Sequence, residues 1–290
     1  VLAIAFTVAV RLPSFFPPAH SAESATFRGA DGRRHVYLGG YDAYYWVRLA
    51  RTYLERGTVC DGNVNGTCVD ATGNAPVGQP IAYAFSPHVM AIAVLYRLLS
   101  RLDPGIPLTT CAMILPVVLS ALAAIPAFAL GALLGGPLGG FLAAVLALCN
   151  PAVLGRTIEG DDDIWIVVLP LAVFCSLAWS LRVRRRWARL ALSALAGALL
   201  AVLAAAWEGW PFFAAAAALG VAAGWVARRS PACAEALAAA AIAFVLSCVV
   251  LGVHPNAGGV LAEAARFAGF AHATGHETTA PLPDDFANVA

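Results

Sequence analysis

One short segment of this sequence, residues 155–163, gathers the side chains best suited to chemistry. It reads Gly-Arg-Thr-Ile-Glu-Gly-Asp-Asp-Asp, so four carboxylates and one guanidinium lie together, and apolar stretches flank it at 140–154 and 164–179. Charges beside a bilayer are costly unless they are paired, hydrated or bound to an ion. Consecutive aspartates also repel one another, and a hard cation is the simplest partner that would hold them together. The segment therefore predicts a cation site, with a solvated loop cap as the alternative.

Within this acidic segment, Asp161 and Asp163 form an Asp-X-Asp pair of the type that holds a divalent ion against a diphosphate. Oxygen ligands of this kind favour Mg²⁺ or Mn²⁺ over Zn²⁺. Arg156 carries the planar guanidinium that binds phosphate well, although it could equally serve as a counter-ion for Glu159 or the aspartates. Asp42 is a further candidate because it stands at the start of a predicted helix, where the dipole favours a carboxylate; alone, it would be interpreted as an N-cap.

The helix that carries Asp42 is predicted over residues 42–56, with Gly57 as its stop signal. It belongs to a long polar stretch, 19–86, that cannot lie in lipid. Aromatic side chains cluster at the start of the helix, and we interpret them as membrane-interface anchors: Tyr41, Tyr44, Tyr45 and Trp46.

Composition places these segments in a membrane protein. Apolar residues make up 60% of the chain and charged residues 12%, whereas soluble domains contain roughly 45–50% and about 25%. The predicted fold class is an all-α polytopic membrane protein. The net charge of +1 argues against nucleic acid as a partner. The apolar segments predicted to span are 108–134, 141–154, 164–181, 190–206, 212–226 and 237–251.

The distribution of arginine sets the predicted orientation. Cytoplasmic loops are rich in basic residues, so the clusters at 182–189 and 228–229 are predicted to lie inside. Counting spans outward from them places the acidic segment outside. The first polar loop joins it there only if the apolar helix at 87–102 lies at the membrane interface; if that helix spanned, Asp42 and Asp161 would face opposite compartments.

We therefore expect an integral protein of the cell membrane whose active face is extracytoplasmic. Its predicted parts, in chain order, are a partial first transmembrane helix at 1–17, a first extracytoplasmic loop with interfacial helices at 18–107, transmembrane helices at 108–253 with a second external loop at 155–163, and the start of a later external loop at 254–290. The chain is expected to be a fragment, because it does not begin with Met and its first apolar stretch is too short to span.

Two of the seven cysteines stand apart from the other five, which lie in apolar runs and are interpreted as packing residues. Cys60 and Cys68 bracket a polar loop, and a disulfide between them is predicted if the loop is extracytoplasmic. A zinc site has less support, because no second Cys/His pair is near. Asn65-Gly66-Thr67 in this loop is an Asn-X-Thr sequon, which we interpret as chance.

Two of these segments resemble motifs of oligosaccharyltransferase catalytic subunits of the bacterial and archaeal single-subunit type. Residues 39–48, Gly-Gly-Tyr-Asp-Ala-Tyr-Tyr-Trp-Val-Arg, resemble the first-loop motif. Residues 150–170 resemble the second-loop motif, in which an Arg, a Gly and an Asp-X-Asp/Glu precede an apolar span that ends in Leu-Pro. The Trp-Glu-Gly-Trp-Pro segment at 207–211 is also similar. The chain thus resembles the N-terminal membrane part of that family.

The resemblance implies a GT-C glycosyltransferase fold and a bound Mg²⁺ or Mn²⁺. Asp42 and Asp161 would be metal ligands. Asp163 would be either a ligand or a group hydrogen-bonded to a ligand, and all three would be catalytic. Arg156 would lie near the donor phosphate. The implied reaction transfers an oligosaccharide from a polyprenyl or dolichyl (di)phosphate, with inversion, to the Asn of an Asn-X-Ser/Thr sequon in an acceptor polypeptide.

The sequence departs from the family pattern in three places. Fewer residues than usual separate Gly160 from Asp161, so which of the three aspartates binds the ion stays open. The third motif, Thr/Ser-Ile/Val-X-Glu, has only partial candidates, residues 288–290 and Glu277. The soluble C-terminal domain with its Trp-Trp-Asp motif is not in the chain, so we expect the chain alone to be inactive.

Two other functions compete with this interpretation. Another GT-C transferase that uses a lipid-phosphate sugar, of the O-mannosyl or aminoarabinose type, would share the first-loop acid but usually lacks the Asp-X-Asp beside Arg. An ion-coupled transporter would carry carboxylates at mid-span depth and internal repeats. The acids here lie at span ends and the sequence shows no such repeat, so both alternatives are less favoured.

Overall fold

The computed structural model describes residues 1–15, 26–30, 32–64, 67–73, 78–81, 85–157, 160–228 and 231–253. Its described helices are α1 (Leu2–Phe15), α3 (Tyr41–Arg56), α4 (Pro87–Leu99), α5 (Leu108–Leu148), α6 (Pro151–Thr157), α7 (Ile164–Ser180), α8 (Arg186–Ala206), α9 (Trp210–Arg228) and α10 (Pro231–Leu251).

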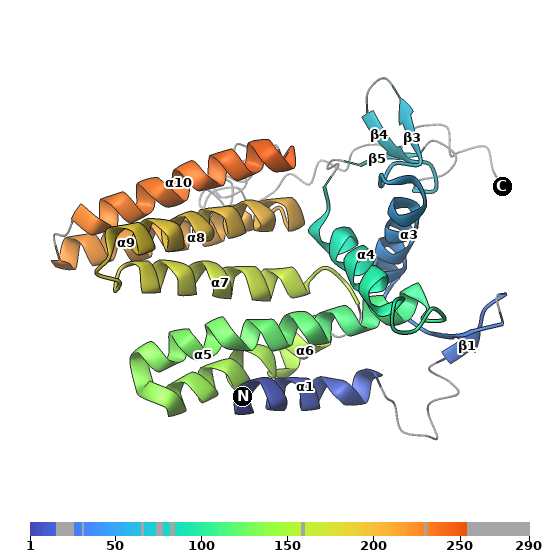
Figure 1. Ribbon diagram of the computed structural model, residues 1–290, viewed down its shortest axis with the longest axis horizontal. Coiled ribbons are helices and arrows are strands. Elements are labelled where there is room, and N and C mark those ends of the chain that lie inside the picture. Colours follow the sequence, from blue (N-terminus) through green and yellow to red (C-terminus); the bar gives the residue numbers. More distant parts are fainter. Residues whose placement is uncertain are drawn as a thin grey trace, which may run out of the picture. The chain divides into compact units, whose positions relative to one another are not determined.

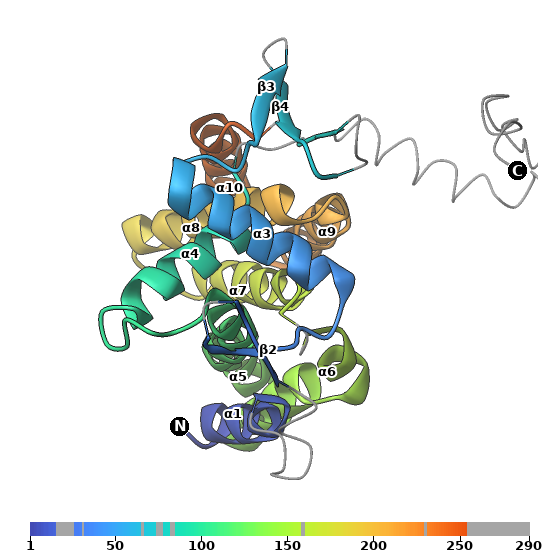
Figure 2. The same cartoon turned by 90° about the vertical axis from the view of Figure 1, so that its right-hand side faces the viewer.

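Helices dominate the described residues, as predicted. Among them, α5, α8 and α10 are long and apolar enough to cross a membrane, and shorter apolar helices lie in α1, α4, α7 and α9. The long helices and α7 run alongside one another, whereas α3 and α4 lie across their ends (Figure 1). Figure 2 shows α3 in front of the bundle, which is seen there end-on.

Helix α5 is a hairpin of two helical arms. The turn predicted at 135–140 begins as expected: Gly135 and Gly136 leave helical geometry, and Gly136 has a φ of 62° that favours glycine. Past the turn the arms pack closely, since a side chain at Gly131 would collide with the backbone of Gly139. Small residues allow such close approach between helices in a membrane.

The returning arm ends earlier than predicted. The sequence suggested one span over 141–154, but α5 stops at Leu148 and the separate helix α6 begins at Pro151. Proline lacks the N–H needed to continue a helix yet suits the first position of a new one. The side chain of Asn150 accepts a hydrogen bond from the backbone N of Val153 at 2.9 Å and so caps α6. Part of the predicted second loop is therefore helical.

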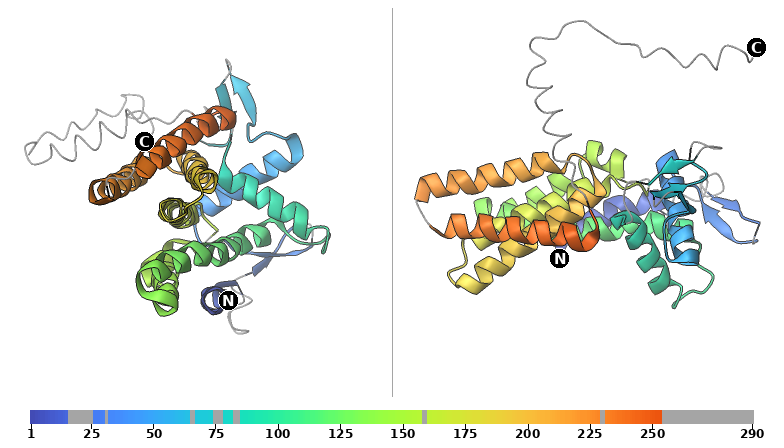
Figure 3. Two further views of the ribbon diagram at one scale, coloured as in Figure 1. Left: turned by 60° about the vertical axis from the view of Figure 1, so that its left-hand side comes forward. Right: turned by 90° about the horizontal axis from the view of Figure 1, so that it is seen from above.

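Helices α8 and α10 pack side by side (Figure 3). Gly197 of α8 lies directly against the backbone of Ala240 in α10. At one end, Glu235 pairs with Arg186 at 3.3 Å and with Arg189 at 2.6 Å. The turn predicted at 207–211 is shorter than expected, because its last two residues already begin α9.

The polar loop between α1 and α4 contains short strands that periodicity did not predict. The antiparallel hairpin β1 (Thr26–Arg28) and β2 (Arg34–Val36) precedes α3. After α3, the strands β3 (Gly62–Val64), β4 (Thr67–Asp70) and β5 (Gln79–Pro80) form an antiparallel sheet with β4 in the centre. Segments of two to four residues are too short to show an alternating pattern.

Helix α3 is anchored in a core that it shares with the bundle. It starts and ends close to the prediction, with Gly57 in the left-handed conformation at its C-terminus. One cluster of buried apolar side chains joins α3, α4, α5 and α7, and includes Val47, Ile92, Leu115 and Ile164. This core packs α3 against α4, α5 and α7.

Candidate functional site

The acidic segment begins in the last turn of α6 and ends just before α7, and the backbone of Gly160 within it packs against α5. Gly160 has a φ of +79°, and a side chain there would approach the backbone O of Ala112 to 3.3 Å. A residue other than glycine would therefore be strained on two counts. Asp161 follows immediately, and Asp163 occupies the N-cap position of α7 without a side-chain capping bond.

Asp161 connects the acidic segment to the first loop. Its Oδ1 accepts a hydrogen bond from Nε1 of Trp46 at 3.1 Å and another from the backbone N of Asp162 at 2.7 Å. Trp46 lies four residues after Asp42 on α3, so the two side chains occupy the same face of the helix. The tryptophan predicted to be an interface anchor is thus also a partner of the acidic segment.

Asp163 pairs with the arginine of the same segment. Nε of Arg156 lies 3.0 Å from Oδ2 of Asp163; the side chain of Arg156 is 79% exposed and that of Asp163 is 22% exposed. Burial raises the pKa of Asp163, the charge of Arg156 opposes this, and the charges of Asp161 and Asp42 raise the pKa further. Asp42, which is itself exposed, is therefore close enough for its charge to act on Asp163.

Asp162 has a different environment from its two neighbours. It lines a cavity of about 190 Å³ whose wall includes Trp46 and His88. Burial, a hydrogen bond with Asp161 and the charges of Asp161 and Asp163 raise the pKa of Asp162 to about 8. The three aspartates thus have different surroundings. Asp161 contacts Trp46 of the first-loop motif and Asp163 contacts Arg156 of the second-loop motif, whereas Asp162 lines the cavity.

Sequence reasoning did not identify His88, which contacts the acidic segment from α4. Its side chain is 1% exposed. Nε1 of Trp165 lies 3.2 Å from Nδ1 of His88, and Nε2 of His88 lies 3.1 Å from the backbone O of Gly160. The indole N–H can only donate, so Nδ1 is the acceptor and Nε2 carries the proton that is donated to Gly160. A lone histidine at the start of an apolar helix was the available signal.

Arg11 was also missed, and it contacts the other end of the segment. Its guanidinium is 1% exposed in α1. It donates to the backbone O of Thr157 at 3.2 Å, to Oγ1 of Thr157 at 2.9 Å and to the backbone O of Leu148 at 3.2 Å. The charge of an arginine within an apolar stretch could have pointed to it, but only the fold reveals these partners.

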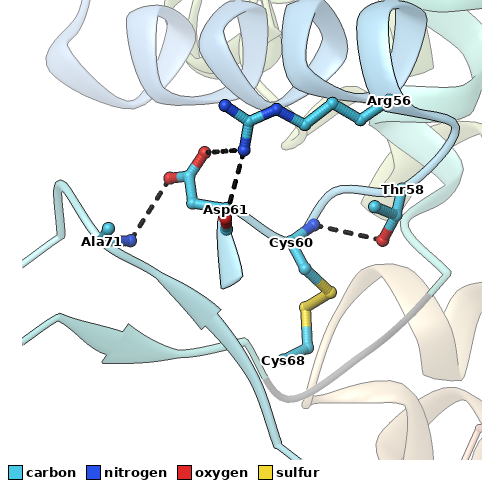
Figure 4. The surroundings of a disulfide bond; sticks show 6 residues. All are labelled: Arg56, Thr58, Cys60, Asp61, Cys68 and Ala71. Atoms are coloured by element: carbon cyan, nitrogen blue, oxygen red, sulfur yellow. Dashed lines mark hydrogen bonds and ion pairs between the residues drawn. A yellow bond between two sulfur atoms is a disulfide. The ribbon is translucent and has the colours of Figure 1, made fainter. Parts of the chain in front are cut away.

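The first loop is cross-linked just after α3 ends. Cys60 and Cys68 form a disulfide, which leaves neither available to zinc (Figure 4). Beside it, Asp61 forms ion pairs with Arg56 at 3.6 Å and with Arg48 at 3.2 Å. Arg48 thereby connects α3 to this cross-linked loop.

Asp70 is the buried acid of this loop, with a side chain 1% exposed. It pairs with Arg48 and accepts hydrogen bonds from the backbone N of Thr72 at 2.9 Å and of Gly73 at 3.0 Å. Burial alone would raise the pKa of Asp70, but these hydrogen bonds outweigh burial and lower the pKa to about 2.

The donor set suits a divalent cation whose shell is completed by other ligands. Within the described ranges, no three His, Cys, Asp or Glu side chains already converge on one point. Mg²⁺ commonly takes only one or two carboxylates, with water and substrate phosphates as its other ligands. Asp161 and Asp163, with Asp42 nearby, supply such oxygens, and a cation would relieve the repulsion that raises the pKa of Asp163. These residues therefore fit a metal that is held jointly with a substrate.

Several predicted features lie outside the described residues. They are Glu159, the first two residues of the sequon, Asn65 and Gly66, and the whole of 254–290, with both candidates for the third motif, Glu277 and 288–290.

Comparisons with known proteins agree with the motifs. The family model described as "Oligosaccharyl transferase STT3, N-terminal" matches residues 20–276. A dolichyl-phosphooligosaccharide-protein glycotransferase of Methanococcus voltae is 27% identical over an alignment of 190 residues, and the match covers 62% of this chain and 20% of that protein. The chain thus spans about a fifth of the length of that relative. Because the family match covers most of the chain, this protein belongs to the STT3 oligosaccharyl transferase family.

Proposed function

We propose that the protein of which this chain forms part transfers an oligosaccharide from a polyprenyl or dolichyl (di)phosphate to the Asn of an Asn-X-Ser/Thr sequon in an acceptor polypeptide, with inversion. It would be an oligosaccharyltransferase, and its partners would be the lipid-linked oligosaccharide, the acceptor and the membrane. One observation carries the proposal: the motifs of the two loops meet through the hydrogen bond from Trp46 to Asp161. The family match and the similarity to the Methanococcus voltae glycotransferase support it.

The proposed metal is Mg²⁺ or Mn²⁺, held by Asp42 and Asp161. Asp163 would be a further ligand or a group hydrogen-bonded to a ligand. Bound there, the cation would neutralise the charge that develops on the leaving phosphate. Carboxylate oxygens not used by the ion would accept hydrogen bonds from the acceptor amide and weaken its conjugation, which favours attack by the amide nitrogen.

Arg156 is proposed to contact the donor phosphate. Its exposed guanidinium pairs with Asp163. Planar guanidinium groups bind phosphate through paired hydrogen bonds. When a phosphate approaches, Arg156 would leave the carboxylate of Asp163 and bind the phosphate. Asp163 would then be free to face the ion or the acceptor.

The proposed site would lie on the extracytoplasmic side. The first loop at 18–107 and the membrane part at 108–253 stay proposals, and α6 takes up residues 155–157 of the predicted second loop. The orientation of α3 and α4 across the ends of the bundle suits helices at the membrane interface (Figure 1). The disulfide between Cys60 and Cys68 suits an oxidising compartment. The arginines at 182–189 would lie in the cytoplasm, because loops rich in basic residues favour that side.

The test is a peptide glycosylation assay on the full-length protein with Asp42→Ala and Asp161→Ala, with and without Mn²⁺. We expect each variant to lose at least a hundredfold in turnover, whereas Asp103→Ala, in the exposed turn before α5, keeps parental turnover. Unchanged activity in both site variants would overturn the site assignment. A peptide with Ala in place of the acceptor Asn tests transfer to a hydroxyl instead: its glycosylation at parental rate would contradict transfer to the Asn.

A further inference from the structure

The backbone of the acidic segment needs a fixed position, because its aspartates follow a glycine in left-handed geometry. Gly160 has a φ of +79° and lies against the backbone of Ala112 in α5. On another side, the carbonyl O of Gly160 lies 3.1 Å from Nε2 of the buried His88.

Both ring nitrogens of His88 are engaged, so its orientation and its tautomer are fixed. The indole N–H of Trp165, on the second residue of α7, donates to Nδ1. Nε2 must then carry the hydrogen that is donated to Gly160. One side chain therefore joins α4, the start of α7 and the residue directly before Asp161.

The same ring also supports the side chain that contacts Asp161. The rings of Trp46 and His88 lie 5.6 Å apart in a T-shaped arrangement, a geometry that stabilises aromatic pairs. Trp46 donates to Oδ1 of Asp161 at 3.1 Å. His88 thus acts on Asp161 along two routes, through the backbone of Gly160 and through the indole of Trp46.

We propose that His88 is a positioning residue that sets the direction in which the carboxylate of Asp161 faces the divalent ion. The inference rests on the proposed function, because it concerns the metal ligand named there. Groups that orient metal ligands through hydrogen bonds typically change metal affinity 10- to 100-fold when they are removed.

The experiment measures Mn²⁺ binding to the purified full-length protein in detergent, from the electron paramagnetic resonance signal of free Mn²⁺, alongside the melting temperature. His88→Leu removes both hydrogen bonds, whereas His88→Gln keeps an N–H near the position of Nε2. Ile92→Ala is the matched control: Ile92 is fully buried one turn further along α4 and has no polar group to contact the segment.

We expect His88→Leu to raise the Kd for Mn²⁺ at least tenfold and His88→Gln to raise it less than about threefold. Ile92→Ala should lower the melting temperature and leave the Kd unchanged. An equal Kd in His88→Leu and Ile92→Ala would overturn the inference. If His88→Leu does not fold, His88→Asn replaces it: its shorter amide can still meet Trp165 but does not reach the carbonyl O of Gly160, and a parental Kd there would equally overturn the inference.

Asp161→Ala distinguishes failure of this inference from failure of the proposed function. Loss of Mn²⁺ binding in Asp161→Ala together with parental binding in His88→Leu would leave the metal site standing and reject only the role of His88. Parental binding in Asp161→Ala would reject the metal site itself, and the role of His88 with it.

Discussion

At the scale of single residues, the three consecutive aspartates are distinguished by their neighbours rather than by their order. Asp161 meets the indole of Trp46, and Asp163 meets the guanidinium of Arg156. Asp162 instead lines the cavity beside His88. The sequence predicted a metal site shared between Asp42 and the acidic segment. It left open which of the three consecutive aspartates faces the ion, because adjacent identical side chains carry no pattern that distinguishes them.

This separation leads to a prediction for a matched pair of substitutions in the full-length protein. Asp161→Asn should lower turnover of a sequon peptide at least a hundredfold, because it removes the charge that faces the first loop. Asp162→Asn should keep turnover within about fivefold, since an amide of the same shape can line the cavity.

Steady-state rates at saturating Mn²⁺ measure both effects, with the melting temperature of each variant as the control for folding. A larger loss in Asp162→Asn than in Asp161→Asn would reverse the assignment of the two acids.

At the scale of elements, the helix that presents Asp42 is held by the loop that follows it. Arg48 on α3 pairs with Asp61 and Asp70, on either side of the disulfide-linked hairpin. The sequence predicted α3 and its end at Gly57 because helical periodicity and a stop signal are local. It did not predict β3–β5, because strands this short are defined by their pairing and not by their own residues.

The lowered pKa of Asp70 predicts how this loop responds to acid. Its pKa is about 2 in the folded protein against 3.8 in the unfolded chain, so the unfolded state binds more protons between these values. The stability contributed is complete above about pH 5 and is lost as the pH falls through 2; it amounts to about 2 kcal/mol.

Hydrogen exchange of residues 67–73 in the full-length protein, measured between pH 5 and pH 2 and corrected for intrinsic rates, checks this. Protection should fall toward low pH. At pH 5, Asp70→Asn should be less protected than the parent protein, and its protection should change less between pH 5 and pH 2. The same dependence of protection on pH in the parent and in Asp70→Asn would contradict the role of Asp70.

At the scale of the whole molecule, distant parts of the chain meet at the acidic segment. α1 reaches it through Arg11, α3 through Trp46 and α4 through His88. Composition and apolar runs predicted the long apolar helices α5, α8 and α10 and the hairpin within α5, because burial in lipid imposes long apolar segments. These three contacts were not predictable, since each joins residues with no local relation in sequence.

Arg11 provides the test at this scale. Arg11→Met keeps much of the length but leaves the carbonyls of Thr157 and Leu148 without their donor, at a cost of about 1–3 kcal/mol. We expect a lower melting temperature of the full-length protein than for Leu12→Ala, a substitution of the exposed next residue of α1. Equal melting temperatures in the two variants would show that the buried guanidinium does not hold α1 in place.

The partners of Arg11 also impose an order on biogenesis. Its acceptors lie 137 and 146 residues further along the chain, and at about 5–20 residues per second a ribosome needs roughly 7–30 s to synthesise that stretch. During this interval the guanidinium must stay hydrated or reach toward lipid headgroups, since an unpaired charge is costly in the bilayer core. Final seating of α1 therefore follows the emergence of α6, and the contacts of the acidic segment with α1, α3 and α4 form after those three helices and α5 have been made.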